Sequence, residues 1–246
     1  MRAVITAGGT VGGEFASAIG TPVKALAPFR GGTLLDVVID ACEAAGIDGS
    51  AVVGGPAVRA QLGSRAVRVI DAAVDGGTNV LRALDAWPGE RFVYLTSDLP
   101  FATGAGVRDL IDRGGTAGLA MALGDVAAYR ACFPGAAPHA IALRGERIAN
   151  GSAFVIAAEA VAPARVLATR FFAARKSLFA LARLLGPALC LRFATKRLGV
   201  ADVEAYGTRV LGVAVAAVRN CDPGLCYDVD TLEEYRYACA PAEDAR

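Results

Sequence analysis

The sequence predicts a single α/β domain in which a parallel sheet carries helices on both faces. Short apolar segments alternate with longer segments whose apolar residues recur at helical spacing, which is the pattern of strand–helix–strand units. Several of the strand-like segments run into glycines, as strands do where a sheet meets its ligand. The chain has 246 residues, of which 54% are hydrophobic and 20% charged, so it can bury one sizeable core.

The first elements follow one another in this pattern. Ala3–Ala7 is a β-branched run ending at a glycine pair, which indicates a buried first strand and a glycine loop. Residues 34–45 have apolar positions at helical spacing and stop at Gly46, a suitable residue just beyond a helix end. Residues 51–53 form the next apolar run, and the turn-like Gly54-Gly55-Pro56 follows it.

The middle of the chain continues the alternation. Strands are expected at 67–70, 91–96 and 117–123, and helices at 77–87, opened by Thr78 and closed before Pro88, and at 106–113.

The C-terminal part is less regular. Strands are expected at 140–143, 153–157 and 210–218, and a helix at 232–239. Residues 163–206 are helical in pattern and basic, and we interpret them as a helical insertion or lid within one domain spanning 1–246. The tail from Pro241 is expected to be frayed.

The composition excludes several classes of chemistry. His139 is the only histidine, so a zinc site built on two or three histidines is excluded, and His139 itself is expected to be a structural or surface residue. A net charge of +1 argues against a general nucleic-acid binder. The six cysteines form no CxxC pair and indicate reduced thiols. No signal peptide or membrane-length apolar run is evident, so we expect a cytoplasmic protein.

Lys24 follows the glycine loop closely and is the only lysine in the first 170 residues. Glycines after a strand let backbone N–H groups approach phosphate oxygens, although neither a P-loop nor a Rossmann fingerprint is present. A lysine nearby can neutralise a triphosphate. An ordinary turn and a solvated surface lysine are the alternatives.

Acidic residues mark two further positions. Asp98 ends the strand at 91–96, and Asp228 and Asp230 lie on one face if their segment is a strand. Carboxylates with substrate phosphates are the usual ligands of Mg²⁺, which favours a metal site. Helix capping is the alternative for Asp98 and for Asp230 or Thr231.

The order of these motifs resembles that of the MobA-like NTP transferases, within the nucleotide-diphospho-sugar transferase (GT-A-like) fold. The motifs that carry the resemblance are the glycine pair, "PVKAL" around Lys24, "LTSDLP" around Asp98 and "DVDTLEE" from Asp228. The resemblance implies a three-layer α/β/α fold with a mostly parallel, mixed central sheet. It also implies transfer of a nucleotide from an NTP to a small phosphorylated acceptor, with Mg²⁺ as cofactor and release of pyrophosphate.

The resemblance also implies roles for individual residues. Lys24 and Asp98 would be catalytic, and Asp98 would hold Mg²⁺ with Asp230, the better match, or Asp228. Residues 150–152 are interpreted as a turn in which Asn150 and Ser152 contact the acceptor. The expected nucleotide-binding residues are Ala7, Gly8, Gly9, Thr10, Gly77, Thr78, Asn79 and Thr96.

One departure from the family pattern leaves other functions open. The family loop usually carries an arginine between the glycines and the lysine, but residues 10–23 contain none, and Glu14 brings the opposite charge. Arg30, or Arg175 with Lys176, are the candidates to replace the missing positive charge. The alternatives are therefore a glycosyltransferase of the GT-A type that uses a nucleotide sugar, and a catalytically weak nucleotide-binding protein.

The basic helical block has alternatives of its own. Residues 165–197 mix aromatic and leucine residues with arginines, so contact with an anionic membrane is one alternative. Packing on the sheet or on a second subunit, in a homo-oligomer, is the interpretation we favour.

Overall fold

The computed structural model describes residues 1–240, and the tail from Pro241, for which fraying is predicted, lies outside the described residues. One central sheet has the strand order β10–β7–β9–β6–β1–β4–β5, and β8 pairs with β9. β9 is antiparallel to both of its neighbours in this order, and the other neighbouring strands are parallel, so the predicted mixed, mostly parallel sheet is confirmed. The strands are β1 (Arg2–Thr6), β4 (Gly49–Gly54), β5 (Val67–Asp71), β6 (Phe92–Thr96), β7 (Leu119–Asp125), β8 (Ala140–Leu143), β9 (Glu146–Ile156) and β10 (Val215–Arg219).

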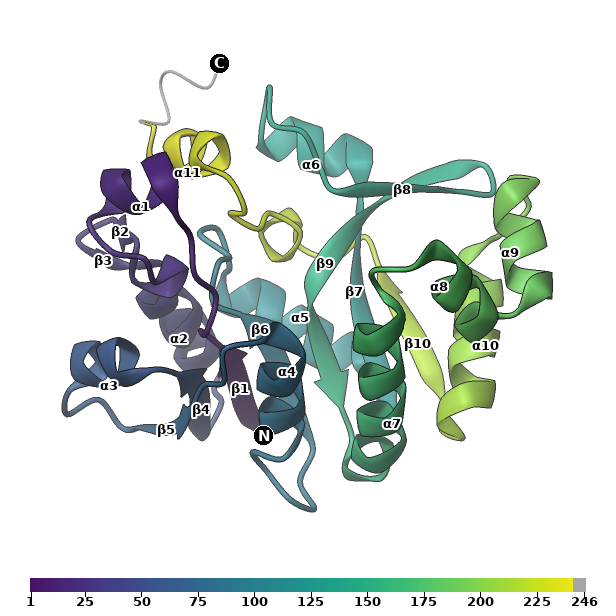
Figure 1. Ribbon diagram of the computed structural model, residues 1–246, viewed down its shortest axis with the longest axis horizontal. Helices are drawn as coiled ribbons and strands as arrows, with labels where there is room; N and C mark the ends of the chain where they lie inside the picture. Colours follow the sequence, from purple (N-terminus) through teal and green to yellow (C-terminus); the bar gives the residue numbers. More distant parts are fainter. Residues whose placement is uncertain (241–246) are drawn as a thin grey trace.

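Helices cover both faces of this sheet (Figure 1). One layer contains α4 (Gly76–Leu84), α7 (Ala158–Ala174) and α10 (Val200–Leu211), and α8 (Leu178–Leu185) and α9 (Pro187–Ala194) extend from it. The remaining helices are α1 (Gly13–Ile19), α2 (Leu34–Ala44), α3 (Pro56–Leu62), α5 (Gly104–Gly114), α6 (Val126–Cys132) and α11 (Leu232–Cys239). Short pieces complete the chain: the one-turn helices η1 (Lys24–Leu26) and η2 (Pro223–Leu225), and a hairpin of β2 (Pro28–Phe29) and β3 (Gly32–Thr33).

The core has two parts because side chains alternate across a strand. In β1, Ala3 and Ile5 are buried against one helical layer and Val4 against the other. Both faces of the central strands are therefore apolar, which is why their sequences read as continuous hydrophobic runs.

Two predicted elements differ from the structure. Residues 150–152 are not a turn but lie inside β9, and the chain reverses before them, where Gly145 adopts a φ of 76°. Residues 210–211 are the end of α10 rather than the start of a strand, because Gly212, with a φ of 69°, ends the helix and β10 starts only at Val215. Short apolar runs are compatible with either structure, and here neighbouring packing decided.

Helix boundaries also differ in places. α4 is opened by Asp75, whose carboxylate accepts the Thr78 N–H, and not by Thr78. Pro56, interpreted as part of a turn, instead starts α3, since the fixed φ of proline suits the first helical position. The block 163–206 is helical as expected, but its first helix begins at Ala158 and its last one reaches Leu211. Within residues 1–240, no helix combines the length and the apolar composition that crossing a bilayer requires.

Candidate active site

The glycine loop after β1 is attached to the segment that carries Lys24. The Val11 N–H donates to the Pro22 carbonyl, and the Lys24 N–H donates to the Gly9 carbonyl. Thr10 and Val23 form an isolated antiparallel bridge between these hydrogen bonds. Backbone contacts therefore place the Lys24 side chain beside the glycine loop, as the sequence predicts.

The Lys24 ammonium contacts two carboxylates that come from distant parts of the sequence. Its Nζ lies 2.5 Å from Asp98 Oδ2 and 2.6 Å from Asp230 Oδ1. The Lys24 side chain is only 14% exposed. Burial opposes the charge on Lys24, but Asp98 and Asp230 outweigh it, so the pKa of Lys24 is raised.

Asp98 stands at the carboxyl end of β6, next to β1, and is buried. Its backbone carbonyl accepts a hydrogen bond from the Val229 N–H, which attaches the C-terminal acidic segment to this strand end. Asp98 Oδ1 is buried and has no hydrogen-bond partner within the described residues. An orphaned carboxylate oxygen is costly unless something binds it, so this atom fits a metal ligand.

Asp228 and Asp230 lie in an irregular segment rather than a strand, yet the structure brings them together as predicted. Ligand atoms of His139, Asp228 and Asp230 all lie within 4.8 Å of one another. Burial first, and then the neighbouring charges of Asp98 and Asp230, raise the pKa of Asp228 to about 6. Such a concentration of negative charge is eased by a divalent cation.

His139 is the residue that sequence reasoning placed outside the site. Its Nε2 lies 3.2 Å from Glu234 Oε1 and 4.0 Å from Asp228 Oδ1. Glu234 in turn accepts the N–H groups of Asp230 and Thr231, in the capping box that opens α11. The capping interpretation and the acidic cluster are thus both present. No local signal in the sequence points to His139, since only the fold brings residue 139 to residue 228.

A pocket of about 350 Å³ opens in front of the glycine loop. It is lined by seven of the predicted residues, namely Gly8, Gly9, Thr10, Lys24, Asn79, Thr96 and Asp98. Ala7 lies behind it, buried, with its N–H donated to the Val53 carbonyl. Phe172 of α7 also lines the pocket, and sequence reasoning did not include it.

Gly8 and Asn79 meet at the floor of this pocket. A Cβ on Gly8 would lie 2.5 Å from Asn79 Nδ2, so any side chain at this position would displace the Asn79 amide. The Asn79 amide is buried and makes two hydrogen bonds with the backbone of Ala73. Asn79 therefore shapes the pocket by holding the loop before α4.

Gly77 and Thr78 are placed beside the pocket and do not line it. A Cβ on Gly77 would lie 2.9 Å from Cγ of Phe172, so Gly77 allows the aromatic ring to close against α4. The Arg175 guanidinium lies 5.0 Å from the centre of the same ring. A basic group of the helical block therefore stands next to the pocket wall.

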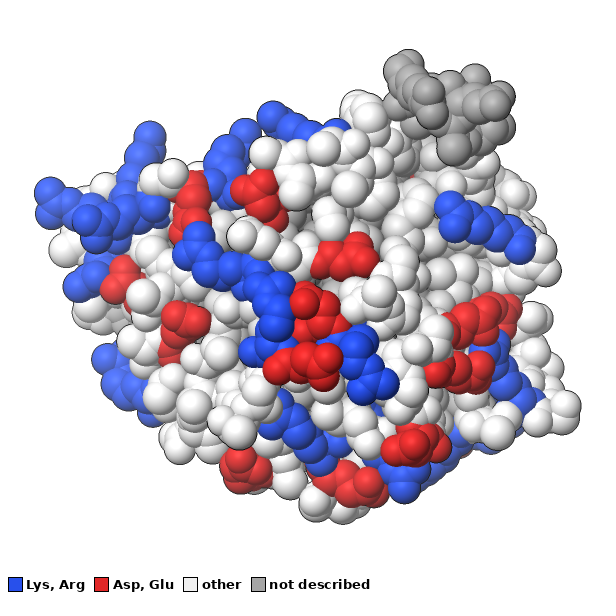
Figure 2. Space-filling model, turned by 180° about the vertical axis from the view of Figure 1, so that it is seen from behind, with Lys and Arg blue, Asp and Glu red and all other residues white. Residues whose placement is uncertain are grey.

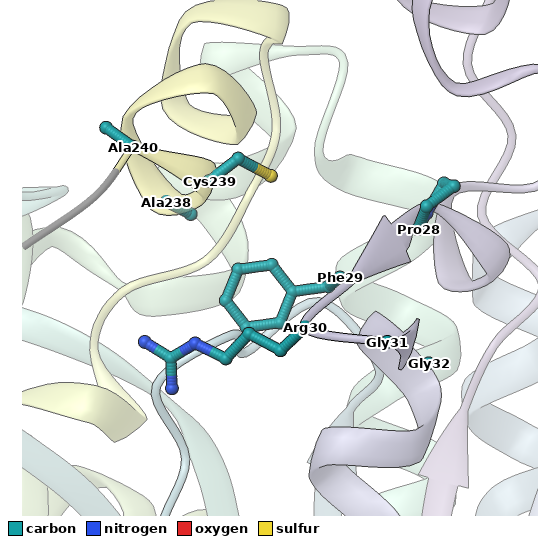
Figure 3. A pocket seen from close by; sticks show the side chains of 8 residues that line it. All are labelled: Pro28, Phe29, Arg30, Gly31, Gly32, Ala238, Cys239 and Ala240. Carbon is teal, nitrogen blue, oxygen red and sulfur yellow. The ribbon is translucent and has the colours of Figure 1, made fainter.

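Asn150 and Ser152 lie on β9 and do not line the pocket. The Asn150 N–H donates to the His139 carbonyl, which places this part of β9 beside the acidic cluster. Arg30, a candidate for the absent loop arginine, lies elsewhere. It is at the β2–β3 turn, over the rings of Phe29 and Phe101, and lines another pocket of about 660 Å³ beside the end of α11 (Figure 3).

Comparison with known proteins identifies the family of the chain. The family model described as the MobA-like NTP transferase domain matches residues 3–186. A solved structure described as a hypothetical transferase from Thermus thermophilus is 30% identical, with a TM-score of 0.84, and covers 95% of this chain and 98% of its own. Among curated proteins, none matches this chain.

More distant structures share the fold. A 2-C-methyl-D-erythritol 4-phosphate cytidylyltransferase, also from Thermus thermophilus, has a TM-score of 0.54 at 16% identity, with 97% of each chain covered. A protein of Mycobacterium tuberculosis, solved in complex with manganese, has a TM-score of 0.50 at 21% identity, with 97% of this chain and 96% of its own covered. At these identities the likeness concerns the fold alone.

Proposed function

The chain belongs to the MobA-like NTP transferase domain family, and from its site we propose that it moves a nucleoside monophosphate from an NTP to a phosphorylated acceptor, with Mg²⁺ as cofactor. The observation that carries the proposal is the contact of Lys24 with Asp98 and Asp230 beside the glycine loop. A cation and a set of carboxylates at the end of a glycine loop provide the charges that a triphosphate and a divalent metal need.

The nucleotide would occupy the pocket in front of Gly8, Gly9 and Thr10. Backbone N–H groups of a glycine loop can approach phosphate oxygens because no side chain intervenes. The base would lie toward Asn79 and Phe172, which line the same pocket. Gly77 and Thr78 would act indirectly, by shaping the start of α4.

Mg²⁺ would be held by Asp98 with Asp230 or Asp228. The unpartnered Asp98 Oδ1 supports this assignment because it is a ligand atom that no other group uses. The raised pKa of Asp228 supports it too, since this carboxylate is buried beside the charges of Asp98 and Asp230. The chemistry that the ion supplies when bound is neutralisation of phosphate charge. Its presence would also relieve Lys24 of neutralising Asp98 and Asp230, so that the ammonium can contact the phosphates.

The acceptor would approach from the side of β9, near Asn150 and Ser152. A phosphate oxygen of the acceptor attacks the α-phosphorus and forms a new P–O bond, the bond from the α-phosphorus to the bridging oxygen breaks, and pyrophosphate leaves with those electrons. Lys24 stabilises the charge that develops on the α-phosphoryl oxygens. Positioning and charge neutralisation suffice for such a reaction, so no histidine needs to act as a base.

The test is pyrophosphate release with each NTP, Mg²⁺ or Mn²⁺, and a panel of phosphorylated sugars and alcohols. The wild-type protein should release pyrophosphate with one combination, and Asp98→Asn should reduce the rate by a factor on the order of a hundred or more. Asp71→Asn, on an exposed carboxylate of β5, is the matched control and should leave the rate unchanged.

Three outcomes would contradict the proposal. Equal rates for wild type and Asp98→Asn would exclude the site. Cleavage of a nucleotide sugar without use of an NTP would indicate a glycosyltransferase. A rise in melting temperature with NTP but no turnover across the panel would indicate a nucleotide-binding protein that lacks the activity.

A further inference from the structure

We propose that the arm formed by α8 and α9 binds the surface of a membrane rich in anionic lipids. This arm comprises residues 175–197, and the proposal does not depend on the reaction proposed above. Three features of the arm favour such binding: its exposed apolar side chains, its uniform charge and its position beside the nucleotide pocket.

The arm exposes large apolar side chains that proteins ordinarily bury. Leu178 and Phe179 are 88% and 80% exposed, and Leu191 and Phe193 are 65% and 58% exposed. Neither α8 nor α9 contains a single buried residue. A cluster of this kind on a surface indicates an interaction site.

These side chains are distinct from those that attach the arm to the domain. Leu184 and the partly exposed Leu185 line an apolar cavity of about 400 Å³ together with residues of the sheet, α4, α7 and α10. The Tyr206 hydroxyl donates to the Leu184 carbonyl and holds α8 to α10. Packing on the sheet therefore accounts for the inner side of α8 and leaves Leu178 and Phe179 without a partner within residues 1–240.

The charge of the arm has one sign. The arm contains no Asp or Glu, while six of its residues are basic: Arg175, Lys176, Arg183, Arg192, Lys196 and Arg197. Arg165 and Arg170 of the neighbouring α7 add to this charge. Arg165 pairs with Asp85 and Arg192 with Asp202, and the other six of these eight basic residues form no ion pair with the described residues. Figure 2 shows blue side chains gathered at the end of the molecule where Figure 1 places α9.

This combination selects an anionic lipid surface over the other possible partners. Basic side chains attract anionic headgroups, and exposed leucine and phenylalanine gain free energy when they enter the acyl boundary. A second copy of this face would carry the same positive charge and be repelled. Aliphatic side chains such as Leu178 and Leu191 contribute no stacking to nucleic acid, and the net charge of the whole chain is only +1.

The position of the arm connects the surface to the pocket. Phe172, near the end of α7, lines both the nucleotide pocket and the apolar cavity under the arm. Arg175, where the arm begins, lies over the Phe172 ring. A membrane bound to the arm would therefore lie close to the nucleotide pocket.

The experiment is flotation of the full chain with vesicles of phosphatidylcholine alone and of phosphatidylcholine with about 30% phosphatidylglycerol. We expect binding to the anionic vesicles only, and its loss as salt is raised to about 0.5 M, where charge attraction is screened. Leu178→Ser with Phe179→Ser, and separately Lys176→Glu with Arg183→Glu, should each weaken binding on the order of tenfold.

The control is a double variant outside the arm, Ile141→Ser with Arg130→Glu. It makes the same two kinds of substitution, apolar to serine and basic to glutamate, and both positions are exposed. This variant should bind vesicles as the wild type does, and all variants should keep the wild-type melting temperature because the changed side chains are exposed. Three results would overturn the proposal: no binding to anionic vesicles, binding that the arm variants do not change, or a dimer or a nucleic-acid complex that the arm variants abolish in place of vesicle binding.

Discussion

Lys24 and Asp98 neutralise each other across the site, with 2.5 Å between Nζ and Oδ2. The lysine comes from the segment after the glycine loop and the aspartate from the end of β6. The two groups that the proposed reaction needs most are therefore also a structural ion pair, and changing either one should affect both stability and activity.

The first prediction concerns Lys24→Met. Loss of the ammonium leaves Asp98 and Asp230 without a cation, so we expect the protein to lose about 3 kcal/mol of unfolding free energy, measured in urea. Pyrophosphate release should be abolished. Millimolar Mg²⁺ or Mn²⁺ should restore more stability to this variant than to the wild type, because a dication can replace the missing charge. Equal stabilisation of both proteins by the metal would show that the carboxylates do not hold it.

Asp228→Asn should have the opposite effect on stability. The pKa of Asp228 is raised to about 6, so its ionised form at pH 7.5 is less favourable in the folded chain than in the unfolded chain. Removing this charge should stabilise the metal-free protein by up to about 3 kcal/mol, since each unit of pKa shift corresponds to about 1.4 kcal/mol. The gain should shrink below about pH 6, where the folded-state carboxyl is already protonated.

The same variant should be stabilised less by divalent metal than the wild type. Thermal melts with and without metal check both effects. Destabilisation of the metal-free variant at pH 7.5 would be inconsistent with the crowding of carboxylates that the structure shows.

Gly8→Ala tests the floor of the pocket. The added Cβ would meet Asn79 Nδ2 at 2.5 Å and displace the amide that holds Ala73. We expect the nucleotide affinity, measured by calorimetry, to fall on the order of tenfold or more. A clash of this kind costs about 1.4 kcal/mol or more, and about 1.4 kcal/mol of binding free energy corresponds to a tenfold change in affinity. Gly12→Ala is the matched control, because a Cβ there has nothing within 4 Å and the φ of Gly12 is −134°.

Phe172→Ala should weaken nucleotide binding, because it removes one wall of the pocket. The expected loss is about fivefold to a hundredfold in affinity, which corresponds to roughly 1–3 kcal/mol for an aromatic ring that stacks on a base. Phe171→Ala is the control, since Phe171 is half-exposed and does not line this pocket. Equal affinities of the two variants would place the base elsewhere.

The cysteines should differ sharply in reactivity. Burial, with a smaller effect of Glu43, raises the pKa of Cys42 to about 12, so at pH 8 almost no thiolate is present. Cys132 is exposed. A thiol reagent should modify Cys132 in the native protein and reach Cys42 only after unfolding, as mass spectrometry of the labelled peptides would show. Rapid labelling of native Cys42 would contradict its burial.

Much of the fold could be predicted because it depends on local patterns. The alternation of apolar runs and helical segments indicated the order of the main elements, and glycines after strands indicated the ligand edge of the sheet. The predictions failed at short segments such as residues 150–152 and 210–211, where local preference is weak and packing against neighbouring strands or helices decides the structure.

Some residues of the candidate site could likewise be predicted from the sequence, and others could not. Gly8, Lys24, Asp98 and the two aspartates of the "DVD" motif became candidates because their residue types and order have chemical meaning in the sequence alone. His139 and Phe172 could not be identified, because each reaches the site through the arrangement of whole elements: His139 just before β8, and Phe172 on α7 against the start of α4.

The sequence by itself determined which charged residues are candidates for the site and the alternating architecture, since both are encoded in residue types and spacings. Only the tertiary structure decided that Lys24 contacts Asp98 and Asp230, 74 and 206 positions away, and that the arm stands beside the pocket. Such contacts arise from the parallel alignment of β1 with β6 and from the hydrogen bond between Val229 and Asp98, neither of which leaves a local mark in the chain.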